Sequence, residues 1–192
     1  MSEPLKTFLS WFEDAKKSGI KEPTSMTVST VDAQGRPNSR VLLLKGVDER
    51  GFVFYTNYES AKGLELMERP YAALCFYWNP PGRQVRVRGP VERVSKEEGD
   101  AYFASRAYVS KIGAWASQQS RPLGGYAELE RAVAATMLKH PLGKVPRPPH
   151  WSGFRVFAEE IELWEELPFR LHRRVLHKRQ ADGSWAGQAL FP

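Results

Sequence analysis

Three polar side chains near the middle of the chain are spaced so that they can bind one phosphate group together. Tyr102, Arg106 and Ser110 follow one another at intervals of four residues. In an α-helix such residues lie on one face. If the segment is helical, a phenol, a guanidinium and a hydroxyl point the same way, and all three donate hydrogen bonds, as a phosphate requires. The alternative is an exposed amphipathic helix with ordinary polar residues.

A second group of cations is expected near the end of the chain. Residues 169–179 have the pattern of a β-strand, so Arg170, His172 and Arg174 would lie on one face, with Leu171 on the other. Two guanidinium groups beside an imidazole are costly unless an anion lies between them. The pattern indicates either an anion site or a strand face exposed to water.

The signatures of several catalytic classes are missing from the sequence. It contains no glycine-rich dinucleotide fingerprint, no Walker loop and no Gly-x-Ser-x-Gly elbow. The four histidines lack metal-ligand spacing with carboxylates, and the single cysteine, Cys75, allows neither an internal disulfide nor a cysteine-based zinc site. A strand-rich enzyme of this kind must take its chemistry from an organic cofactor, and no metal is expected.

The composition predicts a globular protein, with 42% hydrophobic and 12% aromatic residues among 192. No apolar run approaches the roughly 20 residues that span a membrane, and the N-terminus lacks a signal-peptide pattern. We therefore expect a cytoplasmic protein without a membrane partner. The net charge of +6 fits either nucleic acid or a basic pocket for small phosphate ligands, because the cations are interleaved with apolar residues and form no tail.

Periodic apolar residues predict a mainly β chain with flanking helices. Helices are expected at residues 3–18, 60–68 and 127–139 and, after a capping box at 95–98, in the segment that leads to residues 102–120. Strands are expected at 26–30, 40–45, 52–57, 71–78, 83–94, 154–157, 161–164, 169–179 and 185–191.

The strand at 83–94 is the most informative of these. Gln84, Arg86 and Arg88 share one face, opposite Val85 and Val87. One face is therefore buried, while the other meets water or a polar ligand. The Gly-Pro pair at 89–90 predicts a bulge or bend.

Six segments, in order along the chain, resemble the pyridoxine/pyridoxamine 5′-phosphate oxidase family. They are Arg-Val-Leu-Leu-Leu-Lys (40–45), Phe-Val-Phe-Tyr-Thr-Asn-Tyr (52–58), Arg-Gln-Val-Arg-Val-Arg-Gly (83–89), Tyr-Phe-Ala-Ser-Arg (102–106), Ser-Lys-Ile-Gly-Ala-Trp-Ala-Ser-Gln-Gln-Ser (110–120) and Arg-Leu-His-Arg-Arg (170–174). The resemblance runs from about residue 20 to the C-terminus.

The resemblance implies an antiparallel split β-barrel of the FMN-binding type, which forms a homodimer with FMN at the subunit interface. Residues 1–192 would form a single domain. Within it we expect an N-terminal helix over 1–19, a proline-rich loop over 140–150, and C-terminal strands for dimerisation and substrate binding over 151–192.

The resemblance also implies which residues form the site. The substrate phosphate would be held by Lys45, Tyr102, Arg106 and Ser110. Arg170 and His172 would face the pyridine ring, with Arg170 as the main catalytic contact. FMN would be held by Arg40, Val41, Leu42, Leu43, Leu44, Lys45, Tyr55, Thr56, Lys62, Gln84, Gln119, Ser120, Trp164 and Arg174.

The activity implied is oxidation of pyridoxamine or pyridoxine 5′-phosphate to pyridoxal 5′-phosphate, with O2 as acceptor and H2O2 as product. Two alternatives stay open: a related flavin oxidase acting on another aromatic metabolite, as in phenazine pathways, and a non-catalytic protein that binds FMN or pyridoxal phosphate. The phosphate-binding set that includes Lys45 and Arg106 argues against the first. Nucleic-acid binding is set aside, because these motifs account for the basic residues.

The sequence departs from the family pattern at a few positions. Ala61 stands where a basic residue usually precedes Lys62, so one contact to the FMN phosphate is expected to be missing. Arg173 replaces an acidic residue, Ala189 replaces an arginine, and residues 165–169 lack a glycine-rich turn. These changes bear on catalytic rate and FMN affinity more than on the fold.

Overall fold

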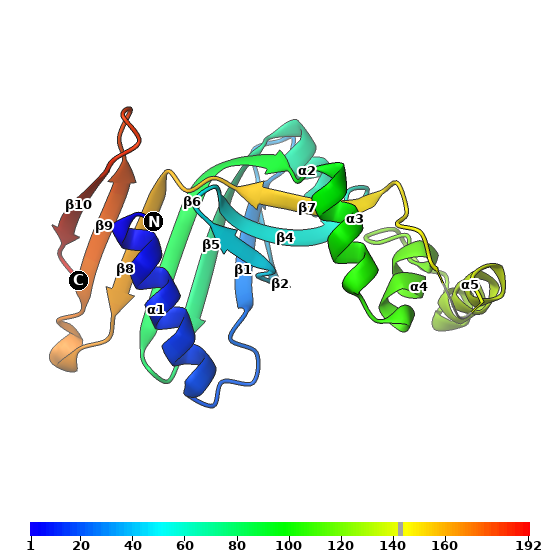
Figure 1. Cartoon of the computed structure of the whole chain (residues 1–192), viewed down its shortest axis with the longest axis horizontal. Coiled ribbons are helices and arrows are strands. Elements are labelled where there is room, and N and C mark those ends of the chain that lie inside the picture. The colour runs from blue at the N-terminus through cyan, green and yellow to red at the C-terminus, as the bar shows by residue number, and fades with distance from the viewer. Residues whose placement is uncertain (142–143) are drawn as a thin grey trace.

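The computed structural model describes residues 1–141 and 144–192 as an antiparallel β-structure with helices packed around it (Figure 1). The strands are β1 (Ser25–Val31), β2 (Pro37–Leu43), β3 (Gly46–Asp48), β4 (Gly51–Asn57), β5 (Tyr71–Trp78), β6 (Arg83–Arg93), β7 (Trp151–Val156), β8 (Glu160–Glu165), β9 (Arg173–Arg179) and β10 (Trp185–Leu190). The helices are α1 (Glu3–Lys17), α2 (Ala61–Glu68), α3 (Lys96–Ser105), α4 (Tyr108–Ala116), α5 (Tyr126–Lys139) and the short 3₁₀ helix η1 (Pro168–Arg170). Among the described residues, none of the helices has the length and apolar character needed to cross a bilayer.

The strands form one sheet whose order is β10-β9-β8-β6-β5-β1-β2, with β7 also on β6, β4 on β7 and β3 on β4. The first part of β6 pairs with β8 and its last residues pair with β7. In Figure 1 the strands around β4 to β7 curl into a half-barrel, and β8 to β10 extend away from it. The predicted mainly β architecture with flanking helices is confirmed.

Strand β6 changes partner at Gly89, where another backbone comes very close. A Cβ atom on Gly89 would lie 1.8 Å from the carbonyl oxygen of Phe157, so any other residue would force the two segments apart. The register with β5 continues through this point, with Ala72 opposite Gly89 and Tyr71 opposite Pro90. Of the bulge or bend predicted for the Gly-Pro pair, the structure shows the bend: β6 curves without an inserted residue (Figure 1).

Helix α1 closes the core of the half-barrel. Its apolar stripe places Phe8 among aromatic side chains of the sheet, with ring centroids 4.9 Å from Phe52 and 5.1 Å from Phe76. Phe8 is fully buried. The N-terminal helix predicted from this stripe is thus confirmed, and its burial is explained by the sheet face that it covers.

Most other predicted elements are confirmed within a few residues. The strand expected at 169–179 begins at Arg173, after η1. The proline-rich loop expected at 140–150 includes residues 142 and 143, which lie outside the described residues; its described part contains neither helix nor strand.

We predict that Phe8→Ala lowers the free energy of unfolding by about 3–5 kcal/mol, because it leaves a cavity among packed rings. Urea unfolding followed by tryptophan fluorescence measures this loss. Tyr126→Ala is the matched control: this aromatic side chain on α5 is 80% exposed, so its removal should change stability by less than about 0.5 kcal/mol. Equal losses in the two variants would contradict the role given to α1.

Candidate active site

A cavity of about 330 Å³ lies where the end of β2, the end of β4 and the C-terminal end of α3 meet. It is lined by Val41, Leu42, Leu43, Lys45, Tyr55, Thr56, Asn57, Tyr102, Arg106, Gln119 and Trp151. All of these except Asn57 and Trp151 are residues that the sequence predicted for the site. Leu44 belongs instead to the buried core.

Arg106 enters this cavity across an aromatic wall. Its guanidinium carbon lies 4.3 Å from the ring centroid of Trp151, and the rings of Tyr55 and Tyr102 stack at 3.8 Å. The Nη1 atom of Arg106 is buried and has no hydrogen-bond partner within the described residues. Burial lowers the pKa of Arg106 and raises the pKa of the Tyr102 phenol, so the phenol keeps its proton. A buried guanidinium N–H without an acceptor is costly, and an anion in the cavity would supply one.

The chain is not one helix through this region, so the single-face prediction for Tyr102, Arg106 and Ser110 is wrong. Helix α3 ends at Ser105, Arg106 has an extended backbone with ψ of 150°, and α4 begins at Tyr108. Tyr102 and Arg106 still meet at the cavity, whereas Ser110 is exposed and does not line it.

The break has a packing reason. Phe103 and Ile112 both belong to the second hydrophobic cluster, which also contains Trp151. At about 100° per residue, positions nine apart lie on nearly opposite faces of a continuous helix. A break between α3 and α4 lets both side chains enter the same cluster.

Lys62 is a second cation for which the described residues provide no ion pair. It lies in the first turn of α2, is 6% exposed, and donates to Thr56 Oγ1 at 3.3 Å, Ser60 Oγ at 3.1 Å and Gln119 Oε1 at 3.3 Å. All three acceptors are neutral. Burial lowers the pKa of the Lys62 ammonium, and the charge of Arg40 lowers it further. A buried ammonium beside a helix N-terminus is a suitable site for a phosphate.

Arg40 lies near Lys62 but is already paired. Its Nη2 donates to Glu65 Oε2 at 3.2 Å, and its Nη1 donates to the hydroxyl of Thr30 and the carbonyl of Val28. The sequence analysis did not predict a role for Glu65. Its position in the expected helix at 60–68 did not indicate that it would form an ion pair with Arg40. Ala61, at the first position of α2, is exposed.

Three other predicted cofactor residues form a row across the sheet, away from the cavity. Gln84 on β6 is opposite Trp164 on β8, and Trp164 is opposite Arg174 on β9. Residues paired in this way point to the same face. Four strands separate β9 from β2 in the sheet order, and in Figure 1 the half-barrel strands lie between β9 and α3.

Arg170 and His172 precede β9, so the prediction that they share a strand face with Arg174 is wrong. Phe169 and Arg170 have φ of 58° and 62°, which turns the chain within η1. The His172 ring lies 4.6 Å from Trp164, and its Nδ1 accepts the backbone N–H of Leu167 at 3.3 Å. Arg170 is exposed.

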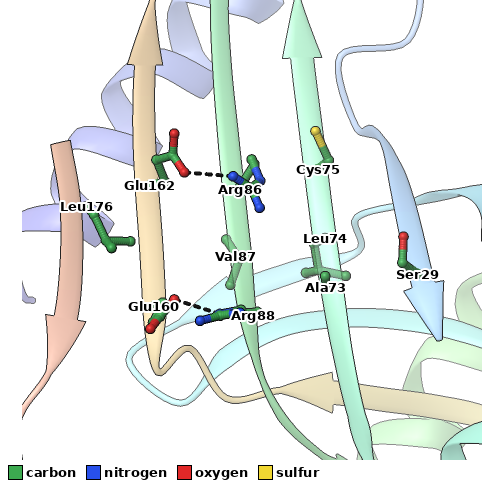
Figure 2. Close-up of a pocket in the computed structure, with 10 residues that line it drawn as sticks. All are labelled: Ser29, Ala73, Leu74, Cys75, Arg86, Val87, Arg88, Glu160, Glu162 and Leu176. Atoms are coloured by element: carbon green, nitrogen blue, oxygen red, sulfur yellow. Dashed lines mark hydrogen bonds and ion pairs between the residues drawn. The ribbon is translucent and has the colours of Figure 1, made fainter. Parts of the chain in front are cut away.

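The face that carries this row continues into an open groove of about 370 Å³ (Figure 2). Arg86 pairs there with Glu162 at 2.8 Å and Arg88 with Glu160 at 2.6 Å. Cys75 lines the groove and is not a core residue, and burial raises the pKa of its thiol. The predicted polar face of β6 is confirmed, and its cations are matched by acids on β8.

Two family models match the chain. One, described as pyridoxamine 5′-phosphate oxidase, matches residues 12–139, and another, described as the pyridoxine 5′-phosphate oxidase C-terminal dimerisation region, matches residues 151–192. The chain belongs to the pyridoxamine 5′-phosphate oxidase family. A protein of Azorhizobium caulinodans named pyridoxine/pyridoxamine 5′-phosphate oxidase is 56% identical over 191 residues, which cover 99% of this chain and 90% of that protein.

Solved structures with the same fold are known. PhzG from Burkholderia lata 383, in complex with tetrahydrophenazine-1-carboxylic acid, matches with a TM-score of 0.93 at 30% identity and covers 100% of this chain and 94% of its own. A pyridoxamine 5′-phosphate oxidase-related, FMN binding protein from Nostoc punctiforme matches with a TM-score of 0.80 at 18% identity over the whole of both chains. The predicted split barrel is confirmed. The roles of individual residues stay predictions.

We predict that the affinity of the Lys62 region for a phosphate ligand, probed with FMN, falls as the pH rises through the lowered pKa of Lys62, in the alkaline range below the usual 10.5. Binding of a phosphate requires the charged ammonium, so affinity is full below that pKa and is lost above it. Fluorescence titration of the FMN-free protein over pH 7–10 measures the effect.

Lys62→Arg is the matched control, because an arginine keeps its charge throughout this range. Any pH dependence that remains in this variant comes from groups other than Lys62. Identical pH profiles for the wild type and Lys62→Arg would contradict a phosphate contact by Lys62.

Proposed function

We propose that this protein oxidises pyridoxamine or pyridoxine 5′-phosphate to pyridoxal 5′-phosphate, with FMN as cofactor, O2 as acceptor and H2O2 as product. The observation that carries the proposal is a pair of cations, buried Lys62 and half-buried Arg106, neither of which forms an ion pair within the described residues. Gln119 links them, since it accepts from Lys62 and lines the cavity that Arg106 enters. Two such cations fit two phosphate groups, one from the cofactor and one from the substrate.

FMN fits the residues around Lys62. When bound, it would accept a hydride from the substrate and pass the electrons to O2. Lys62 and the N-terminus of α2 would hold its phosphate, together with Gln119 and Ser120. Arg40, engaged with Glu65, would add positive potential more than a direct contact.

The substrate would occupy the cavity. Lys45, Tyr102 and Arg106 would hold its phosphate, and the buried aromatic wall would keep water away from it. Arg170 would orient the substrate and stabilise developing negative charge, and His172 would hydrogen-bond the ring substituent. The left-handed backbone at Arg170 supports a functional role, since such conformations are kept where the position of a side chain matters.

The separation of the Gln84–Trp164–Arg174 row from the cavity supports a homodimer. In a pair of chains, the row of one subunit can complete the cavity of the other, with FMN between them. The match of residues 151–192 to a dimerisation region agrees with this arrangement.

The main alternative is a flavin oxidase that acts on a phosphate-free aromatic compound. The similarity to PhzG is the observation that favours this alternative. The cations of the cavity favour a phosphorylated substrate. Anaerobic mixing of the FMN-loaded protein with pyridoxine 5′-phosphate tests the choice. Bleaching of the flavin, followed by recovery and peroxide on admission of air, supports the proposal. A flavin that stays yellow with both phosphorylated vitamers would overturn it and favour a binding protein or another substrate.

We predict that Arg106→Ala raises the KM for pyridoxine 5′-phosphate by about 10- to 150-fold, the loss expected for a hydrogen bond to a charged group. Steady-state peroxide formation measures it. Lys111→Ala removes a nearby cation that does not line the cavity and should leave KM unchanged. Equal KM values for wild type and Arg106→Ala would show that the substrate phosphate binds elsewhere.

We predict that Arg170→Ala retains bound FMN but loses most turnover, because Arg170 acts on the substrate and not on the cofactor. Flavin content and kcat are measured on the same preparation. Arg173→Ala removes the neighbouring exposed cation, which pairs with Glu165, and should leave kcat near the wild-type value. Wild-type turnover in Arg170→Ala would remove the catalytic role.

A further inference from the structure

Glu162 is a buried acid at the centre of a bridge between three strands. It lies on β8, between β6 and β9, and its side chain is 8% exposed. Its Oε2 accepts from Arg86 Nη1 at 2.8 Å (Figure 2), and its Oε1 accepts from Arg174 Nε at 2.8 Å and forms an ion pair with Arg174 Nη2, also at 2.8 Å. Such a carboxylate stays buried because both oxygens are paired.

The bridge fixes Arg174 more than Arg86. The side chain of Arg86 is 55% exposed and gives one hydrogen bond, whereas that of Arg174 is 27% exposed and gives two nitrogens to Glu162. The third nitrogen, Nη1, donates to the carbonyl of Phe191 at 3.0 Å. The whole guanidinium of Arg174 is therefore oriented, beside Trp164 in the cross-strand row.

We propose that Glu162 is a positioning residue for the cofactor, which holds the Arg174 guanidinium in the conformation that binds FMN. This inference rests on the proposed function, in which Arg174 contacts FMN. Without the carboxylate, Arg174 would have to be ordered when FMN binds, and the affinity would fall by that ordering cost.

The chain contains a matched control two residues away. Glu160 lies on the same strand and face as Glu162 and also bridges β6 to β9, by pairing with Arg88 at 2.6 Å and with Lys178 at 3.4 Å. Neither of its partners is a predicted cofactor residue. Glu160→Gln therefore removes a similar ion-pair bridge without changing Arg174.

The test is a double-mutant cycle on FMN affinity, measured by fluorescence titration of the FMN-free protein, with its thermal unfolding as a check on folding. We expect Glu162→Gln to raise the Kd about tenfold and Glu160→Gln to change it less than about twofold. In the Arg174→Ala background, Glu162→Gln should have no further effect. Glu162→Asp, which keeps the charge but shortens the side chain, should give an intermediate Kd and provides a second variant if Glu162→Gln does not fold.

Three results would overturn the inference while the proposed function stands. They are an unchanged Kd in Glu162→Gln, an equal loss in Glu160→Gln, and a loss in Glu162→Gln that persists in full without Arg174. An Arg174→Ala variant with wild-type affinity would also overturn it, because Arg174 would then need no positioning. A wild-type protein that binds no FMN would overturn the proposed function and this inference with it.

Discussion

The alternation of side chains along β6 is the constraint on which the rest of the structure depends. This strand pairs with β5, β7 and β8, so it joins the half-barrel to the C-terminal strands. Val85 and Val87 are buried in the core that α1 closes, and Arg86 and Arg88 face the other side. A slip of one residue would bury the arginines and expose the valines. The register of β6 therefore determines both which residues enter the core and where the Gln84–Trp164–Arg174 row lies.

The cations described above fall into two classes according to their partners. Arg40, Arg86, Arg88 and Arg174 have carboxylate partners, and Arg174 is the one of these that is proposed to contact FMN. Near the cavity, the buried Lys62 and the half-buried Arg106 have neutral or aromatic neighbours. A cation buried with an acid is balanced within the fold, whereas a cation buried without one lowers the stability of the protein until an anion binds. The second class therefore marks where phosphate ligands fit.

The sequence allowed the strands and the core helix to be predicted because their signals are local. Alternation in 83–94 and the apolar stripe of the N-terminal helix need no knowledge of partners. The break at Arg106 could not be predicted in this way, because it arises from the burial of Phe103 and Ile112 in one distant cluster. The turn before β9 was also missed, since Phe169 and Arg170 adopt left-handed conformations that their residue types rarely adopt.

The site was predicted mainly through the family resemblance, and its supporting residues were missed. Trp151 follows Arg106 by 45 residues and meets it only in the folded chain. Glu162 had a readable signal: the acids at 160 and 162 alternate in step with the arginines at 86 and 88. Two strands with such complementary faces are expected to pair. This pattern would have predicted that β8 pairs with β6. It would also have placed the Glu162 carboxylate, which binds Arg174, next to β6. A search for supporting residues in this family can therefore begin with acids that alternate along a strand next to a predicted cofactor arginine.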